Sequence, residues 1–350
     1  MRKYNLRDET EKLLTLNIIN TISLIHEYKG KQALYIESKK DALTSLLNIA
    51  KIQSSEYSNK IEGIQTTDIR IKEIINNKVA PRSRNEEEIA GYRDVLERIH
   101  DNYENIPLTP SVIKQLHKEL YKYSALNFIG KFKASDNYIE EIDKEGNTHI
   151  RFKPVSAFET PMAIDFLCES YNKEINKGEV DPLLLIPIFI IDFLSIHPFA
   201  DGNGRISRLL TLLLLYKSGY IVGKYISIEK LVENSKEGYY DSLKKSSVLW
   251  HENKNQYNSF VEYYLGIILR AYQDFSDRTD YIINKKLTAK ERVQMIIDKN
   301  ISKTTKKQIV EMCPDLNEGS IERALRELLK ENKILKISGG RFASYVINGK

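Results

Sequence analysis

Two strongly apolar segments flank one short polar run, and this arrangement constrains the fold more than any other feature of the chain. Residues 182–199 are apolar apart from interruptions such as Pro187 and Asp192, and residues 209–216 read Leu-Leu-Thr-Leu-Leu-Leu-Leu-Tyr. The first segment is short for a lipid bilayer, which requires about 20 apolar residues. We interpret both segments as helices buried in a protein core, so that the polar run between them forms a loop held in a fixed position.

Most of the remaining chain also has a helical pattern. Apolar residues recur at three- and four-residue spacing in six further segments, which predicts amphipathic helices. These segments are Leu13–Ile25, Leu43–Ile52, Ile89–Ile99, Val112–Leu120, Met162–Tyr171 and Phe260–Tyr272. Residues 138–142 and 148–152 instead flank a polar turn at 143–147 and predict a β-hairpin. The expected fold is therefore all-α, with one small hairpin.

The polar run between the apolar segments reads His-Pro-Phe-Ala-Asp-Gly-Asn-Gly-Arg-Ile-Ser-Arg, from His197 to Arg208. Gly202 and Gly204 can adopt backbone angles that turn amide groups toward an anion, and a helix that begins there adds its positive end. Asp201 precedes them, and a carboxylate beside bound phosphates suits Mg²⁺, which takes its remaining oxygen ligands from water and substrate. These residues predict a phosphate site with a metal ligand.

Three further side chains of the same run suit nucleotide chemistry. Arg205 and Arg208 are three residues apart, which places both on one face of the following helix, where guanidinium groups can bind phosphate oxygens in pairs. A neutral imidazole at His197 is well matched to accepting a proton from a hydroxyl near neutral pH. Each residue alone has an ordinary structural use in a turn, a core or a solvated face. Their combination within twelve residues favours a nucleotide-handling site.

This run resembles the signature of Fic-domain proteins, His-x-Phe-x-Asp/Glu-Gly-Asn-Gly-Arg-x-x-Arg, at every fixed position. The resemblance implies an all-helical core that transfers a nucleoside monophosphate, usually AMP from ATP, to a hydroxyl group of another protein. It implies that His197 deprotonates the hydroxyl, that Asp201 holds Mg²⁺, and that Phe199 packs inward. The implied phosphate ligands are the backbone of Gly202, Asn203 and Gly204, the Asn203 side chain, and Arg205 and Arg208 at the departing pyrophosphate.

A second segment, Ser-Asn-Lys-Ile-Glu-Gly at residues 58–63, resembles the inhibitory motif of the same family, Ser/Thr-x-x-x-Glu-Gly/Asn. Ser58 and Glu62 fall on one helical face, and Gly63 can end the helix behind the carboxylate. By resemblance, Glu62 pairs with Arg208 and occupies the guanidinium that would bind the γ-phosphate of ATP. Breaking a buried pair of this kind costs about 3–5 kcal/mol. The alternative is an ordinary helix end with a surface glutamate.

Two other regions match the family in position. The hairpin corresponds to the family's flap, along which a target protein docks as an extended strand, so residues 138–154 are the expected docking region. The segment Gly-Lys-Phe-Lys at 130–133 resembles the entry to this region, with Lys133 where arginine is usual. Tyr239 and Tyr240 resemble a pair that lines the adenine pocket in related proteins, although paired tyrosines in a helix also serve as packing.

The composition changes near residue 284. Residues 284–350 carry a charge of +7, which leaves −2 for the rest of the chain. The helical segments Ala289–Asp298, Lys306–Met312 and Ser320–Glu331 precede the strand-like segments 334–337 and 342–346, which is the order of a winged helix-turn-helix. Arg323, Arg326 and Lys330 share one side of the third helix, so DNA could bind there, but docking to a protein or homodimer formation is favoured over it.

Length and composition complete the expected organisation. A chain of 350 residues with 41% hydrophobic content favours two or three units, which we place at 1–105 (helical, with the inhibitory motif), 106–283 (catalytic core) and 284–350. Cys168 and Cys313 form no ligand pattern, so neither a disulfide nor zinc is expected. The charged start of the chain lacks an apolar signal segment, and we expect a cytoplasmic protein without membrane attachment.

Three functions therefore remain open. The first is an autoinhibited protein adenylyltransferase that uses ATP and Mg²⁺. The second is the reverse reaction, in which Glu62 orients a water that removes AMP. The third is a DNA-binding regulator whose core serves as a sensor. A relative that transfers UMP or GMP would have nearly the same motif, because the motif handles phosphates and leaves the base unspecified.

Overall fold

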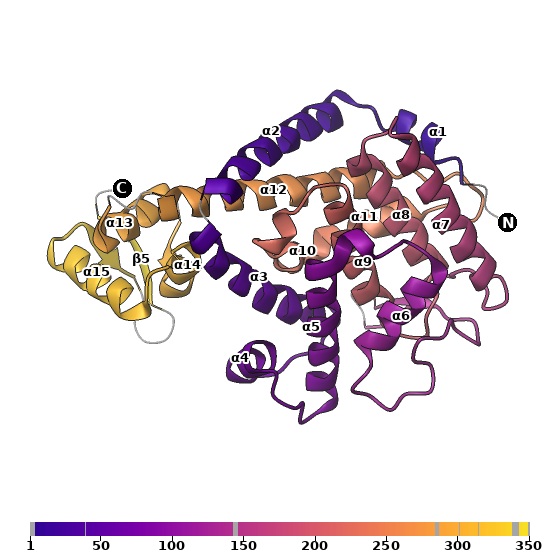
Figure 1. The fold of residues 1–350 in the computed structure, drawn as a ribbon, viewed down its shortest axis with the longest axis horizontal. Coiled ribbons are helices and arrows are strands. Elements are labelled where there is room, and N and C mark those ends of the chain that lie inside the picture. The colour runs from indigo at the N-terminus through magenta and orange to yellow at the C-terminus, as the bar shows by residue number, and fades with distance from the viewer. Residues whose placement is uncertain are drawn as a thin grey trace. The chain divides into compact units, whose positions relative to one another are not determined.

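The structure, a computed structural model, describes residues 4–38, 40–142, 146–283, 287–300, 302–313, 315–337 and 343–348. The chain is mostly helical, with two small antiparallel sheets (Figure 1). It separates into two compact units, and each is described by itself. The larger unit comprises the described parts of Met1–His26 and Ala50–Ala271, and the smaller one comprises those of Glu27–Ile49 and Tyr272–Lys350.

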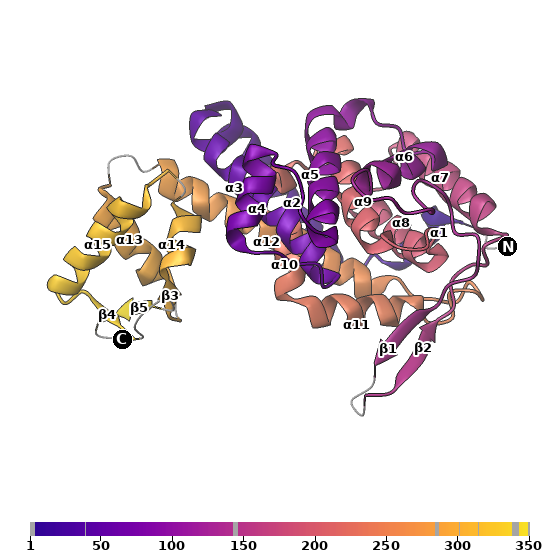
Figure 2. The same ribbon diagram turned by 90° about the horizontal axis from the view of Figure 1, so that it is seen from below.

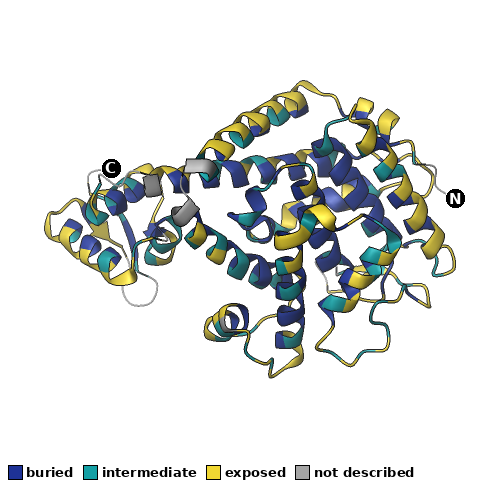
Figure 3. Cartoon of the chain, viewed as in Figure 1, coloured by how far each residue is buried: buried dark blue, intermediate teal, exposed yellow. Residues whose placement is uncertain are grey.

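Two buried helices form the centre of the larger unit, as the sequence predicts. Helix α8 (Pro182–Ile196) begins with Asp181, whose side chain accepts a hydrogen bond from the Leu183 amide. Helix α9 (Asn203–Lys217) begins after Gly202, whose φ of 82° is easy only for glycine. Nearly all their side chains are excluded from solvent (Figure 3). The polar run is thus a short connection between two helices that lie against each other.

Further helices lie along the chain, and those that extend past residues 26 or 271, or begin before residue 50, belong only in part to the larger unit. They are α1 (Leu6–Lys12), α2 (Leu16–Ser38), α3 (Lys40–Ile61), α4 (Asp68–Asn77), α5 (Arg84–Asn102), α6 (Pro110–Leu120), α7 (Thr160–Lys177), α10 (Ile228–Asn234), α11 (Lys236–Ser247) and α12 (Asn258–Ile283). Helix α5 packs against both α6 and α9. Gly91 makes the first contact close, because a Cβ atom there would lie 1.9 Å from the carbonyl oxygen of Leu120. The close approach brings side chains of α5 and α6 to the start of α9.

The predicted hairpin is present. Strand β1 (Ile139–Ile142) pairs antiparallel with β2 (Thr148–Phe152), with Glu141 opposite His149 and an irregularity after Ile139. Figure 2 shows the hairpin extending from the helical body on the side of α11. Part of the predicted turn, residues 143–145, lies outside the described residues. The hairpin is the one departure of the larger unit from a helical architecture within the part of the chain that the structure describes.

The smaller unit contains α13 (Ala289–Lys299), β3 (Thr304–Thr305), α14 (Lys306–Met312), α15 (Glu318–Lys330), β4 (Ile334–Lys336) and β5 (Ser344–Ile347), and its strands are ordered β3-β5-β4. Ile297, Ile309 and Leu328 lie at the centre of its own apolar core. Residues 339, 340 and 342, which we expected in a final hairpin, lie outside the described residues. The three helices followed by β4 and β5 match the predicted order, whereas the short strand β3 was not predicted, and the winged-helix assignment stays a prediction.

The apolar helices do not reach the requirements for a membrane span. Across the described ranges, no helix combines the length and the apolar character needed to cross a bilayer.

Both cysteines are buried thiols, and burial raises the pKa of Cys168 to about 12 and that of Cys313 to about 11. Neither thiol is therefore ionised near neutral pH.

Candidate active site

A cavity of about 250 Å³ brings most of the predicted site residues together. Its lining includes side chains from the polar run, from the end of α3, from the hairpin and from α11. The predicted residues among them are Glu62, His197, Asp201, Gly202, Asn203, Gly204, Arg205, Arg208, Tyr239 and Tyr240. Residues more than 170 positions apart in sequence thus line one cavity. Ser58 and Gly63 are not among the lining residues, but Ser58 bonds to the lining residue Arg208 and Gly63 directly follows Glu62.

His197 ends α8 in a left-handed conformation, with a φ of 52° that is unfavourable for a residue with a side chain. Its Nδ1 atom lies 3.2 Å from the carbonyl oxygen of Leu194. A carbonyl oxygen only accepts, so Nδ1 carries the proton and Nε2 keeps its lone pair in the neutral ring. Burial lowers the pKa of His197 to about 4. The imidazole is therefore a neutral group that can accept a proton through Nε2.

The loop after His197 is held from within by Asn203. The Asn203 side chain donates to the carbonyl oxygen of Phe199 at 2.8 Å and accepts from its amide at 2.9 Å. Phe199 is fully buried and stacks on His117, with ring centroids 3.9 Å apart. The inward packing expected of Phe199 is present. Both polar groups of Asn203 bond to the Phe199 backbone, so this side chain shapes the loop, and its contact with phosphate stays a prediction.

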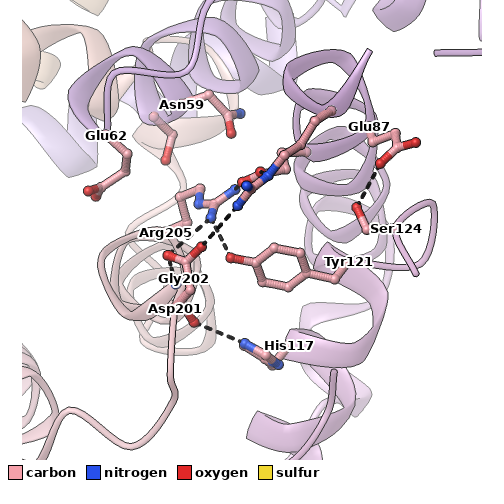
Figure 4. Close-up of polar contacts among 12 residues, drawn as sticks. Asn59, Glu62, Glu87, His117, Tyr121, Ser124, Asp201, Gly202 and Arg205 are labelled. Atoms are coloured by element: carbon pink, nitrogen blue, oxygen red, sulfur yellow. Dashed lines mark hydrogen bonds and ion pairs between the residues drawn. The ribbon is translucent and has the colours of Figure 1, made fainter. Parts of the chain in front are cut away.

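His117 on α6 supports the loop from outside. Its Nδ1 accepts a hydrogen bond from the Gly130 amide at 3.0 Å, which leaves Nε2 protonated to donate to the carbonyl oxygen of Asp201 at 3.1 Å (Figure 4). Burial lowers the pKa of His117 to about 4, so the ring stays neutral. The sequence offered one signal for this role, a histidine on the apolar face of the predicted helix 112–120.

Lys133 and Asn137 complete the support. The Lys133 ammonium donates to the carbonyl oxygen of Ile196 at 3.1 Å and to the Asn137 side chain at 2.7 Å, and the Lys133 amide donates to Pro198. Asn137 in turn donates to the carbonyl oxygen of Phe199 at 3.1 Å. Burial lowers the pKa of Lys133 to about 8. The lysine thus fixes the backbone around His197 with single hydrogen bonds, and Asn137 is a contributor that sequence reasoning missed.

The anion site at the start of α9 lies beneath a carboxylate of the same chain. A Cβ atom on Gly204 would lie 2.2 Å from Oε1 of Glu62, so this glycine is what allows the carboxylate to approach. Amide groups at a helix start attract negative charge. Glu62 therefore takes the position beside the helix start where a phosphate oxygen is expected.

Asp201 stands at the edge of this site with about half of its side chain exposed. Its Oδ1 accepts from the Gly202 amide at 2.6 Å, and its Oδ2 lies 4.0 Å from Arg84. Among the described residues, no group of three or more His, Cys, Asp or Glu side chains could hold a metal ion. One exposed carboxylate fits a Mg²⁺ ion whose other ligands are phosphate oxygens and water.

The two arginines of the run face different partners. The Nη1 atom of Arg205 lies 2.5 Å from Glu88 on α5, and its Nη2 atom donates to the Tyr121 hydroxyl at 2.6 Å (Figure 4). Arg208 donates from Nε to the Ser58 hydroxyl and from Nη2 to Glu62, both at 2.8 Å. The terminal nitrogens of Arg205 are engaged inside the protein, whereas the second arginine is engaged by the predicted inhibitory segment.

Tyr239 and Tyr240 line the far side of the cavity. Their rings pack edge to face, with centroids 5.3 Å apart. Tyr239 is buried beside Phe260 and Tyr263, while Tyr240 is 40% exposed. Tyr240 thus offers an accessible ring to a flat ligand, and Tyr239 has a packing role as well.

Comparisons with known proteins agree with this geometry. A sequence model described as the Fic/DOC family matches residues 107–215. The protein adenylyltransferase Fic of Drosophila yakuba is 23% identical over 306 residues, which cover 81% of this chain and 57% of that protein. The chain thus spans little more than half the length of the curated relatives it matches.

Solved structures show the same fold. A Fic family protein from Desulfovibrio desulfuricans G20 aligns with a TM-score of 0.61 at 20% identity, covering 96% of this chain and 97% of that one. A Fic domain containing signaling protein from Bacteroides thetaiotaomicron aligns with a TM-score of 0.60 at 24% identity, over 74% and 94% of the two chains. The chain is a mostly helical protein that contains a Fic domain, and the run His197–Arg208 lies within that domain.

Proposed function

We propose that this chain is an autoinhibited protein adenylyltransferase that moves AMP from ATP to a Ser, Thr or Tyr hydroxyl of a target protein or of itself. One observation carries the proposal: the Glu62 carboxylate, paired with Arg208, lies over Gly204 in the cavity that His197 lines. The relative named above is a protein adenylyltransferase, and the matching motif supports the same class of chemistry.

The residues have distinct tasks in the proposed transfer. The target hydroxyl oxygen forms a bond to the α-phosphorus, and its proton passes to Nε2 of His197, which is unprotonated. The bond from the α-phosphorus to the bridging oxygen breaks, and pyrophosphate leaves with that electron pair. Amide groups at the start of α9 stabilise the negative charge. Mg²⁺, held by Asp201, would supply further charge neutralisation at the phosphates.

Inhibition in this proposal is competition for one anion site. The phosphates need the helix start and the Arg208 guanidinium, and Glu62 holds both. The chain turns directly after Glu62, because Gly63 has a φ of 80° and its amide donates to the carbonyl oxygen of Lys60, and this turn supports the proposed position of the carboxylate. A triphosphate can bind productively only after the Glu62 carboxylate leaves.

The hairpin is the proposed docking region for the target, over residues 138–154. Within the described chain, β1 pairs with β2 alone, so its other edge has backbone groups that can bond an added strand. Ile139, Arg151 and Phe152 of the hairpin line the cavity itself. A segment added along β1 would therefore carry its hydroxyl toward His197.

Two variants test the proposal. Glu62→Gly is expected to raise AMP transfer or self-modification roughly 5- to 150-fold, the range of a typical regulatory coupling. Adding His197→Ala to that variant should abolish transfer while ATP binding remains, since His197 acts on the proton of the hydroxyl. Mass spectrometry of the protein and of a lysate incubated with Mg²⁺ and each labelled nucleotide measures both. No gain in the Glu62 variant would remove autoinhibition, and a preference for another nucleotide would replace AMP.

Removal of AMP is a second candidate function, favoured by the fact that Glu62 lines the same cavity as His197. A carboxylate there can orient water toward an AMP-modified side chain. Incubating a modified protein with the wild-type chain and with Glu62→Gly separates the two: a hydrolase loses activity in the variant, whereas an inhibited transferase gains it.

For the smaller unit we propose docking to a protein, a second copy of the chain or DNA. Arg323, Arg326 and Lys330 are exposed on α15, while Ile321, Leu325 and Leu328 are buried. Exposed cations at the proposed recognition helix would contact phosphates. DNA retention that falls steeply with salt would support that partner, and a concentration-dependent mass in solution would support a homodimer.

A further inference from the structure

A third arginine, outside the signature, faces the cavity from the hairpin. Arg151 is part of β2 and is partly buried, and it lines the same cavity as His197 and Tyr240. Among the described residues, none provides its guanidinium with a hydrogen bond or an ion pair. Burial lowers the pKa of Arg151, since the charged form is poorly solvated there. A partly buried guanidinium without a hydrogen bond or ion pair is suited to binding an anionic ligand.

The other charged groups near Arg151 already have partners. Glu141 on β1 accepts two hydrogen bonds from Lys244, at 2.7 and 2.9 Å. Of the other guanidinium groups that line the cavity, Arg208 is paired with Glu62 and Arg205 with Glu88. Within the described lining, Arg151 is therefore the one arginine that has no carboxylate within salt-bridge distance, since Glu141 is bonded to Lys244 and attracts Arg151 only from farther away.

We propose that Arg151 binds the α-phosphate of the nucleotide and stabilises the charge that develops on its free oxygens during transfer. The inference rests on the proposed function, because it uses the orientation assumed there. Arg208 would bind the terminal phosphate, and Tyr239 and Tyr240 would bind the base, so a cation that lines the cavity with Tyr240 and His197 lies at the nucleoside end of the triphosphate. The α-phosphate is the phosphate at that end.

Because Arg151 lies on β2, its contact with the α-phosphate would have a second consequence. The target segment would dock on β1, the strand paired with β2, and its hydroxyl must reach the α-phosphorus beside His197. An arginine on the hairpin that grips the α-phosphate would couple the position of the acceptor to the position of the reacting phosphorus. Arg151 would then act as a catalytic residue, in direct contact with the transferred group.

The test compares adenosine, AMP and ATP, which carry no phosphate, one phosphate and three phosphates. In the Glu62→Gly background, Arg151→Ala should weaken the binding of AMP and ATP alike, about 10- to 100-fold by calorimetry, and leave adenosine binding unchanged. It should also slow transfer, and Arg151→Lys should restore part of both effects. If another nucleoside triphosphate binds the Glu62→Gly variant more tightly than ATP, the same series is run with the nucleoside, monophosphate and triphosphate of that base. Lys245→Ala is the control, because Lys245 is an exposed cation of α11 that pairs with Asp241 and does not line the cavity.

Three outcomes would overturn the inference. Weaker binding of ATP alone would place Arg151 at the outer phosphates, and equal weakening of adenosine would place it at the base or ribose. Unchanged nucleotide affinity with a raised KM for the target would assign it to an acidic side chain of the target. A parent that transfers no nucleotide, but whose AMP and ATP binding depends on Arg151, would refute the proposed function and leave this contact standing.

Discussion

The two arginines of α9 lie three residues apart, yet they are held by very different surroundings. Arg205 and its partner Glu88 have side chains that are 1% and 3% exposed. Arg208 is similarly buried at 7%, but its partner Glu62 is 32% exposed and sits at the end of a helix. The first pair is enclosed by α5 and α6, whereas the second joins the interior to a carboxylate that solvent can reach.

We call the enclosed Arg205–Glu88 pair the anchor, because it holds the fold, and the Arg208–Glu62 pair the gate, because it can open. Glu88 also accepts from Arg84 and cannot leave without stranding the Arg205 guanidinium in the interior. Gly63, directly after Glu62, has no atom within 4 Å of the place where a Cβ would be, so the chain there has room to move. Water can replace Glu62 at one side of the pair. The cost of opening the Glu62 pair should therefore be about 1–3 kcal/mol, the range of a typical regulatory coupling, and below the roughly 3–5 kcal/mol expected for a fully buried pair.

Removing the anchor should have the largest effect. Glu88→Ala leaves a buried guanidinium without its partner, and we expect the free energy of unfolding to fall by about 3–5 kcal/mol. Glu87→Ala is the neighbouring control, since Glu87 makes one hydrogen bond to Ser124 at 3.0 Å (Figure 4), and it should cost about 0.5–1.5 kcal/mol. Urea unfolding measures both, together with Glu62→Ala. A loss in Glu62→Ala as large as that in Glu88→Ala would remove the distinction between anchor and gate.

The parts of the molecule that sequence predicted are those fixed by neighbours along the chain. The hairpin, the buried segments predicted at 182–199 and 209–216, and the glycine at the end of α3, Gly63, follow from local patterns of apolar, polar and glycine residues. The spacing of Arg205 and Arg208 also predicted one helical face. It did not predict that the two side chains diverge, because Glu88 and Ser58 lie 117 and 150 residues away from their arginines and only packing brings them close.

The residues that support the loop between α8 and α9 also could not all be predicted from neighbours along the chain. Phe199 was expected to pack inward because the resemblance to the Fic signature implies that role. That Asn203 would bond to the Phe199 backbone, and that His117 would bond to Asp201, depends on where α6 lies against α9. Polar residues have several possible partners, and the sequence alone does not rank them.

The pH dependence of transfer by the Glu62→Gly variant tests whether His197 is enclosed in the protein. Burial lowers the pKa of His197 to about 4, so the base stays unprotonated until the pH falls close to that value. In Glu62→Gly, kcat/KM for transfer should be nearly unchanged between about pH 8 and pH 5.5, where a histidine with an ordinary pKa near 6.5 would already have lost about 90% of its neutral form.

The buried histidines also set the control for that experiment. The pKa of His100 is lowered to about 3 and that of His117 to about 4, in both cases mainly by burial. The unfolded chain therefore takes up protons from about pH 6.5 downward while the folded chain does not, and stability is lost over this range. Circular dichroism at each pH separates unfolding from loss of the base. An acid limb near pH 6.5 with the fold intact would show that the loop does not exclude water from His197.

The smallest expected effect concerns how firmly the gate is closed. The Lys236 ammonium donates to the carbonyl oxygen of Ile61 at 2.7 Å, at the end of the inhibitory helix, where a positive charge is favourable by about 0.3–1 kcal/mol. Lys236→Met removes this contact and keeps the length of the side chain. It should raise basal AMP transfer roughly two- to fivefold, because the carboxylate of Glu62 then leaves more readily.

Lys245, which is exposed and lies on α11 together with Lys236, provides the matched control, since its ion pair is with Asp241 and not with the inhibitory segment. Lys245→Met should leave transfer at the wild-type rate. The comparison becomes sharper in the Glu62→Gly background, where the gate is already absent: there Lys236→Met should have no effect. A gain that persists in that background would mean that Lys236 acts on the nucleotide or the target and has no part in holding the gate.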